Sequence, residues 1–286
     1  MIRDYPTIEI GGVTRKLSLH PRTMVVGDKR CCHAVMGTPG APEIMDRRSW
    51  RPCIDLSSGI TEILDQLQTN GCHSNAGTQG NEMAHRLTGW SDIQLSTGNL
   101  MGQVTGYQNE GAGLDEVLAV LIKSGQCLRS LIPNNDYDGR DWPAESVWKP
   151  DAAKHSVLKA FDCGHGGVFD AMGTCLELGW PVPFGTSAFG GGHAITLCAK
   201  FLYKGVWYFI PANSWGDSWT NFTTEMLQAF AAVCPDQANS QILKRKGMGF
   251  GVFSERKISQ GLDMFGGWGL QSAVYNPDEP LPKIVA

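Results

Sequence analysis

The sequence predicts an α+β fold in which a helical first half precedes a strand-rich second half. Apolar residues recur at helical spacing over residues 114–122, early in the chain. Two strand-like runs, 193–199 and 206–210, flank a turn at Tyr203-Lys204-Gly205 in the later part. With 286 residues, 42% of them hydrophobic, the chain is long enough to bury a large core, as one domain or two closely packed lobes.

In the first half, short strands are expected at residues 7–10 and 23–26, among Gly and Pro turns. A helix is expected over 72–87, although its glycines and polar residues weaken its propensity. The helix over 114–122 has Asp115 and Glu116 in its first turn, and Gly125 closes it. Residues 133–153, rich in Asp, Pro and Trp, are expected to form an insertion or a crossing between lobes.

In the second half, apolar residues between Val168 and Leu176 predict a helix that ends at Gly179, and residues 181–184 predict a short strand. After the hairpin come a helix over 224–233 and a strand over 248–253. The Gly- and Trp-rich residues after about 235 indicate an ordered extension with a loose tail at 277–282.

Of nine cysteines, Cys72 is the best candidate for a nucleophile. It follows the turn residues Asn70-Gly71 and begins the expected helix, so its thiol would lie at a helix N-terminus. Free N–H groups and the positive end of the helix dipole favour the reactive thiolate. The cysteines in apolar runs are expected to be small buried hydrophobes: Cys127, Cys175, Cys198 and Cys234.

Two later motifs supply a base and a group to orient it. His193 enters a strand in Gly191-Gly192-His193-Ala194-Ile195, and Asn213 opens the Trp-bracketed loop Asn213-Ser214-Trp215-Gly216. A cysteine, a histidine and a third residue that orients the histidine are the parts of a nucleophilic thiol enzyme.

The motif around Cys72 resembles that of the papain-like cysteine peptidases. A bacterial and viral branch of this family reads Asp-Gln-Gly-x-x-Gly-Ser-Cys-x-Ala-Asn-Ala, and this chain matches it at Asp65, Gln66, Cys72, Asn75 and Ala76. The order Cys72, His193, Asn213 is also that of the family. The chain departs from it at His73, where the family has an aromatic residue, at Asn70-Gly71 in place of Gly-Ser, and at Thr220 in place of glycine. The disulfide of plant and lysosomal members has no counterpart, because the matching positions are Thr69 and Glu110.

The resemblance implies a two-lobe fold, with a helical first lobe that carries the nucleophile and an antiparallel β-rich second lobe that carries the base. We therefore expect a papain-like catalytic domain over residues 51–234, divided into lobes at about 150. Residues 1–50 would form an N-terminal extension that either adds a strand layer or lies over the cleft. Residues 235–286 would form a C-terminal extension packed on the β-rich lobe.

The resemblance also assigns roles. Cys72 would attack a carbonyl carbon, His193 would move the proton and Asn213 would orient the imidazole. The Gln66 amide and the Cys72 N–H would form the oxyanion hole, with Gln68 as a competing choice. Gly113, Ala112 and Gly192 would bind the substrate backbone, although Gly113 could equally be a plain glycine at the entry of a helix. Trp215 would support the site.

Other readings of these residues are weaker. His73 is next to the nucleophile, but helix neighbours point about 100° apart, so it is expected on the helix surface or a pocket rim rather than as the base. The remaining histidines are expected to be incidental: His20, His33, His85, His155 and His165. No Cys-x2-Cys occurs, so we expect no metal, and no glycine-rich segment precedes Lys-Ser/Thr, so no phosphate cradle is expected.

These observations predict a cysteine peptidase that hydrolyses peptide bonds through a thioester acyl-enzyme, without a cofactor. An acyl transferase or amidase could use the same triad, and a non-catalytic structural or binding module, such as a viral particle component, could reuse the fold. The expected partner is a peptide or protein substrate. A net charge of −4 and the lack of a long apolar run argue against nucleic acid and membrane partners. Without a recognisable signal peptide, a cytoplasmic location is expected, and a viral origin stays open.

Overall fold

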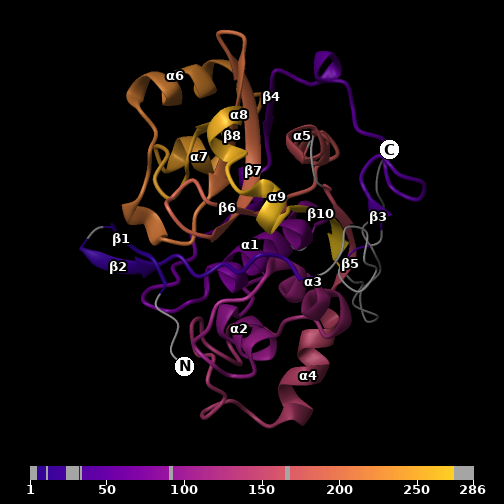
Figure 1. Cartoon of the computed structure of the whole chain (residues 1–286), viewed down its shortest axis with the longest axis vertical. Coiled ribbons are helices and arrows are strands. Elements are labelled where there is room, and N and C mark those ends of the chain that lie inside the picture. The colour runs from indigo at the N-terminus through magenta and orange to yellow at the C-terminus, as the bar shows by residue number, and fades with distance from the viewer. Residues whose placement is uncertain are drawn as a thin grey trace.

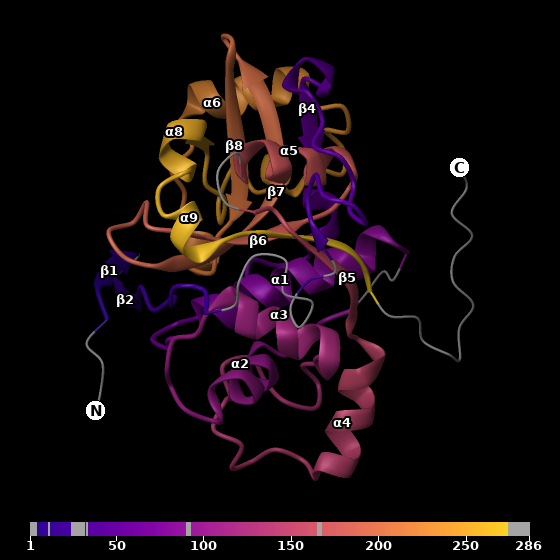
Figure 2. The ribbon, with the colours of Figure 1, turned by 45° about the vertical axis from the view of Figure 1, so that its right-hand side comes forward.

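The computed structural model describes residues 5–10, 12–23, 32, 34–89, 93–164 and 168–273. They form a mixed α+β fold, as predicted, with a helical lobe and a lobe built around a twisted sheet. Figures 1 and 2 show the helical lobe in the lower part of the view and the β-rich lobe above it, with α1 between them.

The helical lobe is made of the first four α-helices: α1 (Cys72–Leu87), α2 (Thr97–Thr105), α3 (Leu114–Lys123) and α4 (Glu145–Lys154). The predicted helices over 72–87 and 114–122 are confirmed as α1 and α3. The sequence analysis missed α2, which begins at a Ser96 side-chain cap and ends at Gly106 in the left-handed conformation. It also did not predict α4, which lies in the segment expected to be an insertion or a crossing between lobes. Pro150 and the polar residues of α4 obscure the helical spacing of its apolar residues.

The β-rich lobe contains a sheet in the order β4-β7-β8-β9, with β6 paired to the other edge of β7. All these pairs are antiparallel. The long hairpin of β7 and β8 confirms the predicted pair of strands around Lys204-Gly205. The strands are β4 (Cys53–Asp55), β6 (Val182–Thr186), β7 (His193–Tyr203), β8 (Val206–Ala212) and β9 (Phe253–Ser254).

Helices α5 (Val168–Glu177), α6 (Thr224–Val233), α7 (Gln241–Lys244) and α8 (Glu255–Ile258) surround this sheet (Figure 1). The strand expected over 248–253 is wrong in extent, since only β9 forms. Gly247 and Gly249 have φ of 79° and 82°, outside the range of a regular strand.

A second sheet joins the lobes, in the order β10-β5-β3. It consists of β3 (Ala34–Val35), β5 (Val157–Asp162) and β10 (Trp268–Ala273), and α9 (Leu262–Phe265) comes directly before β10. In this sheet β10 pairs with β5 antiparallel, whereas β3, from the first 50 residues, pairs with β5 parallel. The early strands β1 (Thr7–Ile10) and β2 (Val13–Lys16) form a separate hairpin. Most of the strand expected at 23–26, and the tail at 277–282, lie outside the described residues.

Helix α1 holds the two lobes together although its sequence is polar. Nearly all its residues are buried, because it packs against α2 and α3 on one side and against β6, β7 and β10 on the other. One direct link is the Thr196 hydroxyl of β7, which donates a hydrogen bond of 2.8 Å to the Ala76 carbonyl. Within the described part of the chain, no helix has the length and apolar character needed to cross a membrane.

Candidate active site

Cys72 is the first residue of α1 and is completely buried. Its Sγ lies 3.6 Å from the Ser18 hydroxyl. Burial raises the pKa of the Cys72 thiol, although hydrogen bonds from the Ala194 backbone and from Ser18 act in the opposite direction. In this covered state, desolvation of the thiol outweighs the hydrogen bonds that favour its thiolate form.

His193 is the first residue of β7 and contacts the asparagine that the sequence analysis paired with it. The His193 Nε2 and the Asn213 Oδ1 are 2.8 Å apart. Because a side-chain carbonyl only accepts, this contact fixes the tautomer with the proton on Nε2. Nδ1 has no hydrogen-bond partner among the described residues, so it is the ring nitrogen left to take a proton from a thiol.

Aromatic rings enclose this hydrogen bond. The His193 ring is stacked on Trp215 at 4.5 Å between centroids, and Phe189 meets its edge at 5.3 Å. Burial lowers the pKa of His193 to about 4, and the bond to Asn213 offsets only part of that shift. Trp215 therefore lies where the sequence analysis expected a supporting residue.

Gln66 connects the nucleophile loop to the loop that carries Asn213. Its Oε1 accepts from the Ser214 hydroxyl at 2.8 Å, and its backbone N–H donates to the Ser214 carbonyl at 2.9 Å. Its Nε2 donates to the carbonyls of Lys16 at 3.0 Å and Thr69 at 3.2 Å. The Gln66 amide, which is expected to stabilise an oxyanion, thus already donates to a carbonyl oxygen of residues 1–50. Gln68, the competing choice for this role, is exposed.

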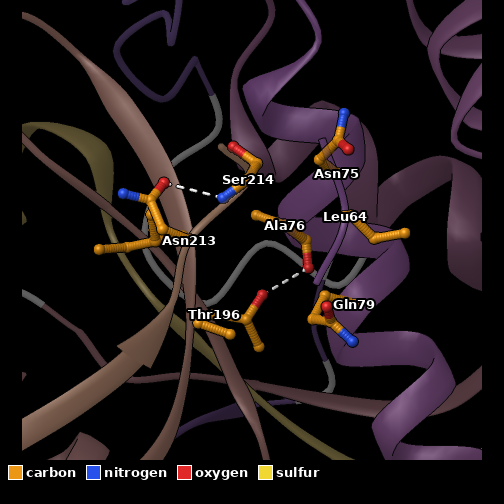
Figure 3. Close-up of a pocket in the computed structure, with 9 residues that line it drawn as sticks. Leu64, Asn75, Ala76, Gln79, Thr196, Asn213 and Ser214 are labelled. Atoms are coloured by element: carbon orange, nitrogen blue, oxygen red, sulfur yellow. Dashed lines mark hydrogen bonds between the residues drawn. The ribbon is translucent and has the colours of Figure 1, made fainter. Parts of the chain in front are cut away.

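A small cavity lies behind these residues, between α1 and the start of the loop after β8 (Figure 3). Asn213 Oδ1 also accepts from the Ser214 N–H at 2.8 Å, so two donors hold the same oxygen. The close-up shows that contact beside the Thr196 link to α1. The lining residues are Leu64, Asn75, Ala76, Gln79, Ile195, Thr196, Ala212, Asn213 and Ser214.

Residues 15–23, which we call the strap, run directly over Cys72 between the two lobes. The Leu19 N–H donates to the Gly192 carbonyl at 2.9 Å, on the β-rich side. The His20 N–H donates to the Ala112 carbonyl at 3.1 Å, on the helical side. Ser18 is completely buried beside the nucleophile, and Leu19 packs in the same apolar cluster as Cys72. The strap therefore covers the candidate nucleophile with extended backbone.

Carboxylates of the two lobes anchor the strap at both ends. Arg15 pairs with Asp65 at 2.9 Å. Arg22 pairs with the fully buried Asp162 at 2.5 Å and lies over the ring of Trp268. The Thr23 N–H and hydroxyl both donate to the Asp115 carboxylate, at 2.6 and 3.1 Å. Of the two roles considered for the first 50 residues, the strap fits a segment lying over the site.

The predicted substrate-binding residues divide into two groups. The Ala112 and Gly192 carbonyls hold the strap backbone, and a Cβ on Gly192 would lie 2.4 Å from the Leu19 carbonyl oxygen. Gly113 instead caps the N-terminus of α3, and its N–H donates to the Glu116 carboxylate at 2.7 Å. The structure thus places Gly113 at the entry of a helix, one of the two roles considered for it.

Several features of the site were missed or misplaced by sequence analysis. Ser18 and Leu19 carry no motif, so nothing in the sequence showed that they meet Cys72. His73 was expected on the helix surface or a rim, but it is completely buried, because α1 packs on both sides. Cys127, Cys175, Cys198 and Cys234 are buried, as predicted. Among the described residues, no group of three His, Cys, Asp or Glu side chains could hold a metal ion.

Solved structures share this fold of a helical lobe and a sheet lobe. Xylellain, a cysteine protease from Xylella fastidiosa, aligns over 90% of this chain and 97% of its own length, with a TM-score of 0.63 and 16% identity. The chain has the papain-like fold.

Two further papain-like structures show the same likeness. Digestive procathepsin L 3 from Tenebrio molitor larval midgut aligns over 91% of this chain and 76% of its own, with a TM-score of 0.58 and 14% identity. The bromelain protease from Ananas comosus, in complex with the E64 inhibitor, aligns over 79% and 99%, with a TM-score of 0.56 and 13% identity. No family model matches the sequence, and no curated protein matches it.

Proposed function

We propose that the protein is a cysteine peptidase that hydrolyses peptide bonds through a thioester acyl-enzyme. The observation that carries this proposal is the strap, because an extended polypeptide segment already lies over Cys72 with its backbone held from both lobes. A site that binds peptide backbone in this way suits a peptide or protein substrate.

In the proposed reaction, the Cys72 Sγ attacks the substrate carbonyl carbon and its proton passes to Nδ1 of His193. The oxygen of the tetrahedral intermediate receives hydrogen bonds from the Gln66 Nε2 and the Cys72 N–H. His193 then gives the proton to the leaving amine, and water hydrolyses the thioester. Asn213 keeps the proton on Nε2, so that Nδ1 carries the lone pair.

The strap must leave before this reaction can occur. It covers Cys72, and its Lys16 carbonyl takes the Nε2 donor that the intermediate needs. We therefore expect the full chain to be latent, and its Cys72 to react slowly with thiol reagents until the strap is displaced.

The test is to map the adducts formed by substoichiometric iodoacetamide or a thiol-directed epoxide at mildly acidic pH. The native chain is compared with a Leu19→Asp variant, in which a buried charge weakens the strap. We expect fast labelling confined to Cys72 in the variant and its loss after His193→Ala, with Cys127 as an internal control for a buried thiol.

Labelling spread over several cysteines, and unchanged by His193→Ala, would contradict an activated nucleophile. Incubation of the Leu19→Asp variant with a peptide library, with and without a primary amine, then separates hydrolysis from acyl transfer. Products ending in a free carboxylate support the peptidase, whereas amine adducts as the main products support a transferase.

A further inference from the structure

The C-terminal end of the strap places an arginine in a pocket made by other parts of the chain. The Arg22 side chain is only 6% exposed, and its Nη2 lies 2.5 Å from Oδ2 of Asp162, the last residue of β5. Its Nη1 lies 3.4 Å from the other carboxylate oxygen. Two guanidinium nitrogens thus face the two carboxylate oxygens, which is the geometry that distinguishes arginine from lysine.

The pocket around this guanidinium belongs to the second sheet and the turn before β10, not to the strap. Trp268 of β10 is completely buried, and the guanidinium carbon of Arg22 lies 5.0 Å from the centre of its ring. Gly266 lies against the same group, since a Cβ there would be 3.1 Å from Nη1. A carboxylate, an aromatic face and a position without a side chain together form a site shaped for a guanidinium.

The pocket stays negatively charged when the strap leaves. The Asp162 side chain has no exposed surface, and besides Arg22 it accepts a hydrogen bond of 2.7 Å from the Gly164 N–H. One backbone hydrogen bond does not compensate a buried carboxylate, because removal of one partner of a buried ion pair leaves an uncompensated charge. The vacated pocket therefore favours a cationic side chain over a neutral one.

The strap reaches this pocket along the groove that is proposed to bind substrate. Ser18 lies beside the Cys72 Sγ, and the next two residues of the strap donate to the Gly192 and Ala112 carbonyls. An extended chain advances about 3.3 Å per residue, so Arg22 lies up to roughly 13 Å along the strap from Ser18. A peptide in the same groove would present a side chain to the pocket from three to four residues beyond the one at Cys72.

We propose that Asp162, Trp268 and Gly266 form a subsite for the arginine side chain of a peptide that replaces the strap. The substrate class is then a peptide with an arginine three to four residues from the one at Cys72, and in this respect the inference rests on the proposed peptidase function. Binding of such a peptide requires no chemistry at Cys72, so it is measured without turnover.

The experiment measures binding of a synthetic peptide to the full chain with this pocket opened. The parent host carries Cys72→Ala, Leu19→Asp and Arg22→Ala, which remove the thiol, weaken the strap and vacate Asp162. The probe is a fluorescent peptide of residues 15–23, Arg-Lys-Leu-Ser-Leu-His-Pro-Arg-Thr, and fluorescence anisotropy gives its Kd.

The residue tested in the peptide is its second arginine, which corresponds to Arg22. Replacement of this arginine by citrulline keeps the shape of the side chain and removes its charge, and we expect the Kd to rise by roughly 10-fold to 100-fold. Lysine at this position should give an intermediate Kd, because an ammonium group keeps the charge and loses the paired contact with the carboxylate.

Two host variants separate the pocket from a general attraction between charges. Asp162→Asn keeps the Oδ1 acceptor and removes the charge, and should lower the ratio of the citrulline Kd to the arginine Kd to less than about threefold. Asp115→Asn is the matched control, since Asp115 is another buried carboxylate and holds Thr23 at the same end of the strap. It should weaken both peptides and leave their ratio unchanged, and thermal unfolding shows that both hosts fold.

The first arginine of the peptide is an internal control. Arg15 pairs with Asp65, whose side chain is 31% exposed, at the opposite end of the strap. Citrulline in place of Arg15 should weaken binding by the same factor in the parent host and in Asp162→Asn, because distant pairs contribute independently.

A library of random nine-residue peptides tests whether the subsite selects sequences other than the strap. Among peptides that bind the parent host, arginine should be enriched at one position, and the enrichment should be lost with Asp162→Asn. Selection without enrichment of arginine would overturn the role of the pocket in substrate choice.

Three results in the peptide experiment would overturn the subsite itself: an arginine peptide that does not bind the parent host, a citrulline peptide that binds it equally well, or a Kd ratio unchanged by Asp162→Asn. Hydrolysis is not measured in any of these steps. Failure of the subsite is therefore distinguishable from failure of the proposed peptidase activity, which the labelling of Cys72 tests separately.

Discussion

The two halves of the candidate site differ in how complete they are. On the β-rich side, His193, Asn213 and Trp215 already have the contacts that orient a base, and aromatic rings shield them. On the helical side, Cys72 lies under Ser18 and the Gln66 amide is taken by Lys16. The proposed base is thus assembled within one lobe, whereas the proposed nucleophile and oxyanion donor are covered by a segment from outside both lobes.

This difference suggests where activity is controlled. Contacts of His193 come from the loop before β7 and the loop after β8, and β7 and β8 pair as one hairpin. Contacts of Cys72 depend on the strap, which is joined to the lobes by side-chain anchors and a few backbone bonds. We therefore expect changes at Cys72 or Gln66 to alter both chemistry and access. Changes at His193 or Asn213 should alter chemistry alone.

The largest effect is expected from the nucleophile itself. Cys72→Ala, in a Leu19→Asp chain with the strap displaced, should lower peptide hydrolysis by at least about 10⁴-fold, because the variant loses the thiol that is proposed to form the acyl-enzyme. Circular dichroism should show an unchanged fold. If Cys72→Ala retains measurable turnover while Cys198→Ala loses it, a different thiol is the nucleophile.

The next effect concerns the oxyanion donor. Gln66→Ala in the same Leu19→Asp chain should lower kcat by roughly 10² to 10³ with little change in KM, because the donor acts mainly in the transition state. Gln68→Ala is the matched control, since Gln68 is a nearby exposed glutamine and should leave kcat unchanged. Equal losses in the two variants would remove Gln66 from the oxyanion hole.

A smaller effect is expected from the orienting residue on the β-rich side. Asn213→Ala removes one hydrogen bond to an imidazole that becomes charged during the reaction, so kcat should fall by roughly 10-fold to 150-fold. The labelling rate of Cys72 in the chain with a native strap should not rise, because Asn213 makes no contact that holds the strap. A strong rise would show that the two sides are not independent.

The smallest effect is expected from an anchor of the strap. Arg22→Ala breaks a buried ion pair with Asp162, and we expect Cys72 of the full chain to be labelled roughly tenfold faster. Arg48→Ala is the control, because its pair with Asp46 is exposed and contributes little. An unchanged rate in Arg22→Ala would mean that the backbone contacts alone hold the strap.

Much of the fold could be predicted because several elements carry strong local patterns. Helix α3 has regular apolar spacing with acidic residues in its first turn, and the hairpin of β7 and β8 has a Lys204-Gly205 turn. Helix α1 has neither, and only the turn residues Asn70-Gly71 before Cys72 indicated where it begins. The α4 helix was hidden, because its apolar residues are few and Pro150 interrupts the pattern.

The candidate site was predictable where one motif carries several of its groups, as in the loops around Cys72 and Asn213. The strap was not, because Ser18 and Leu19 are ordinary residues whose role comes from a contact with Cys72 more than fifty positions away in the chain. The burial of His73 was also hidden, since it depends on packing from two lobes and not on helix periodicity.

The glycine at position 192 has a consequence for how the latent state can be adjusted. A methyl group on Gly192 would collide with the Leu19 carbonyl of the strap. Any other extended chain that donates a hydrogen bond to the Gly192 carbonyl, as Leu19 does, would meet the same methyl group. A substitution at Gly192 therefore cannot exclude the strap without also excluding a substrate whose backbone binds in the same way. The strength of inhibition can instead be changed by substitutions in the strap, residues 15–23. Such a substitution weakens binding of the strap and leaves the candidate substrate-binding site unchanged.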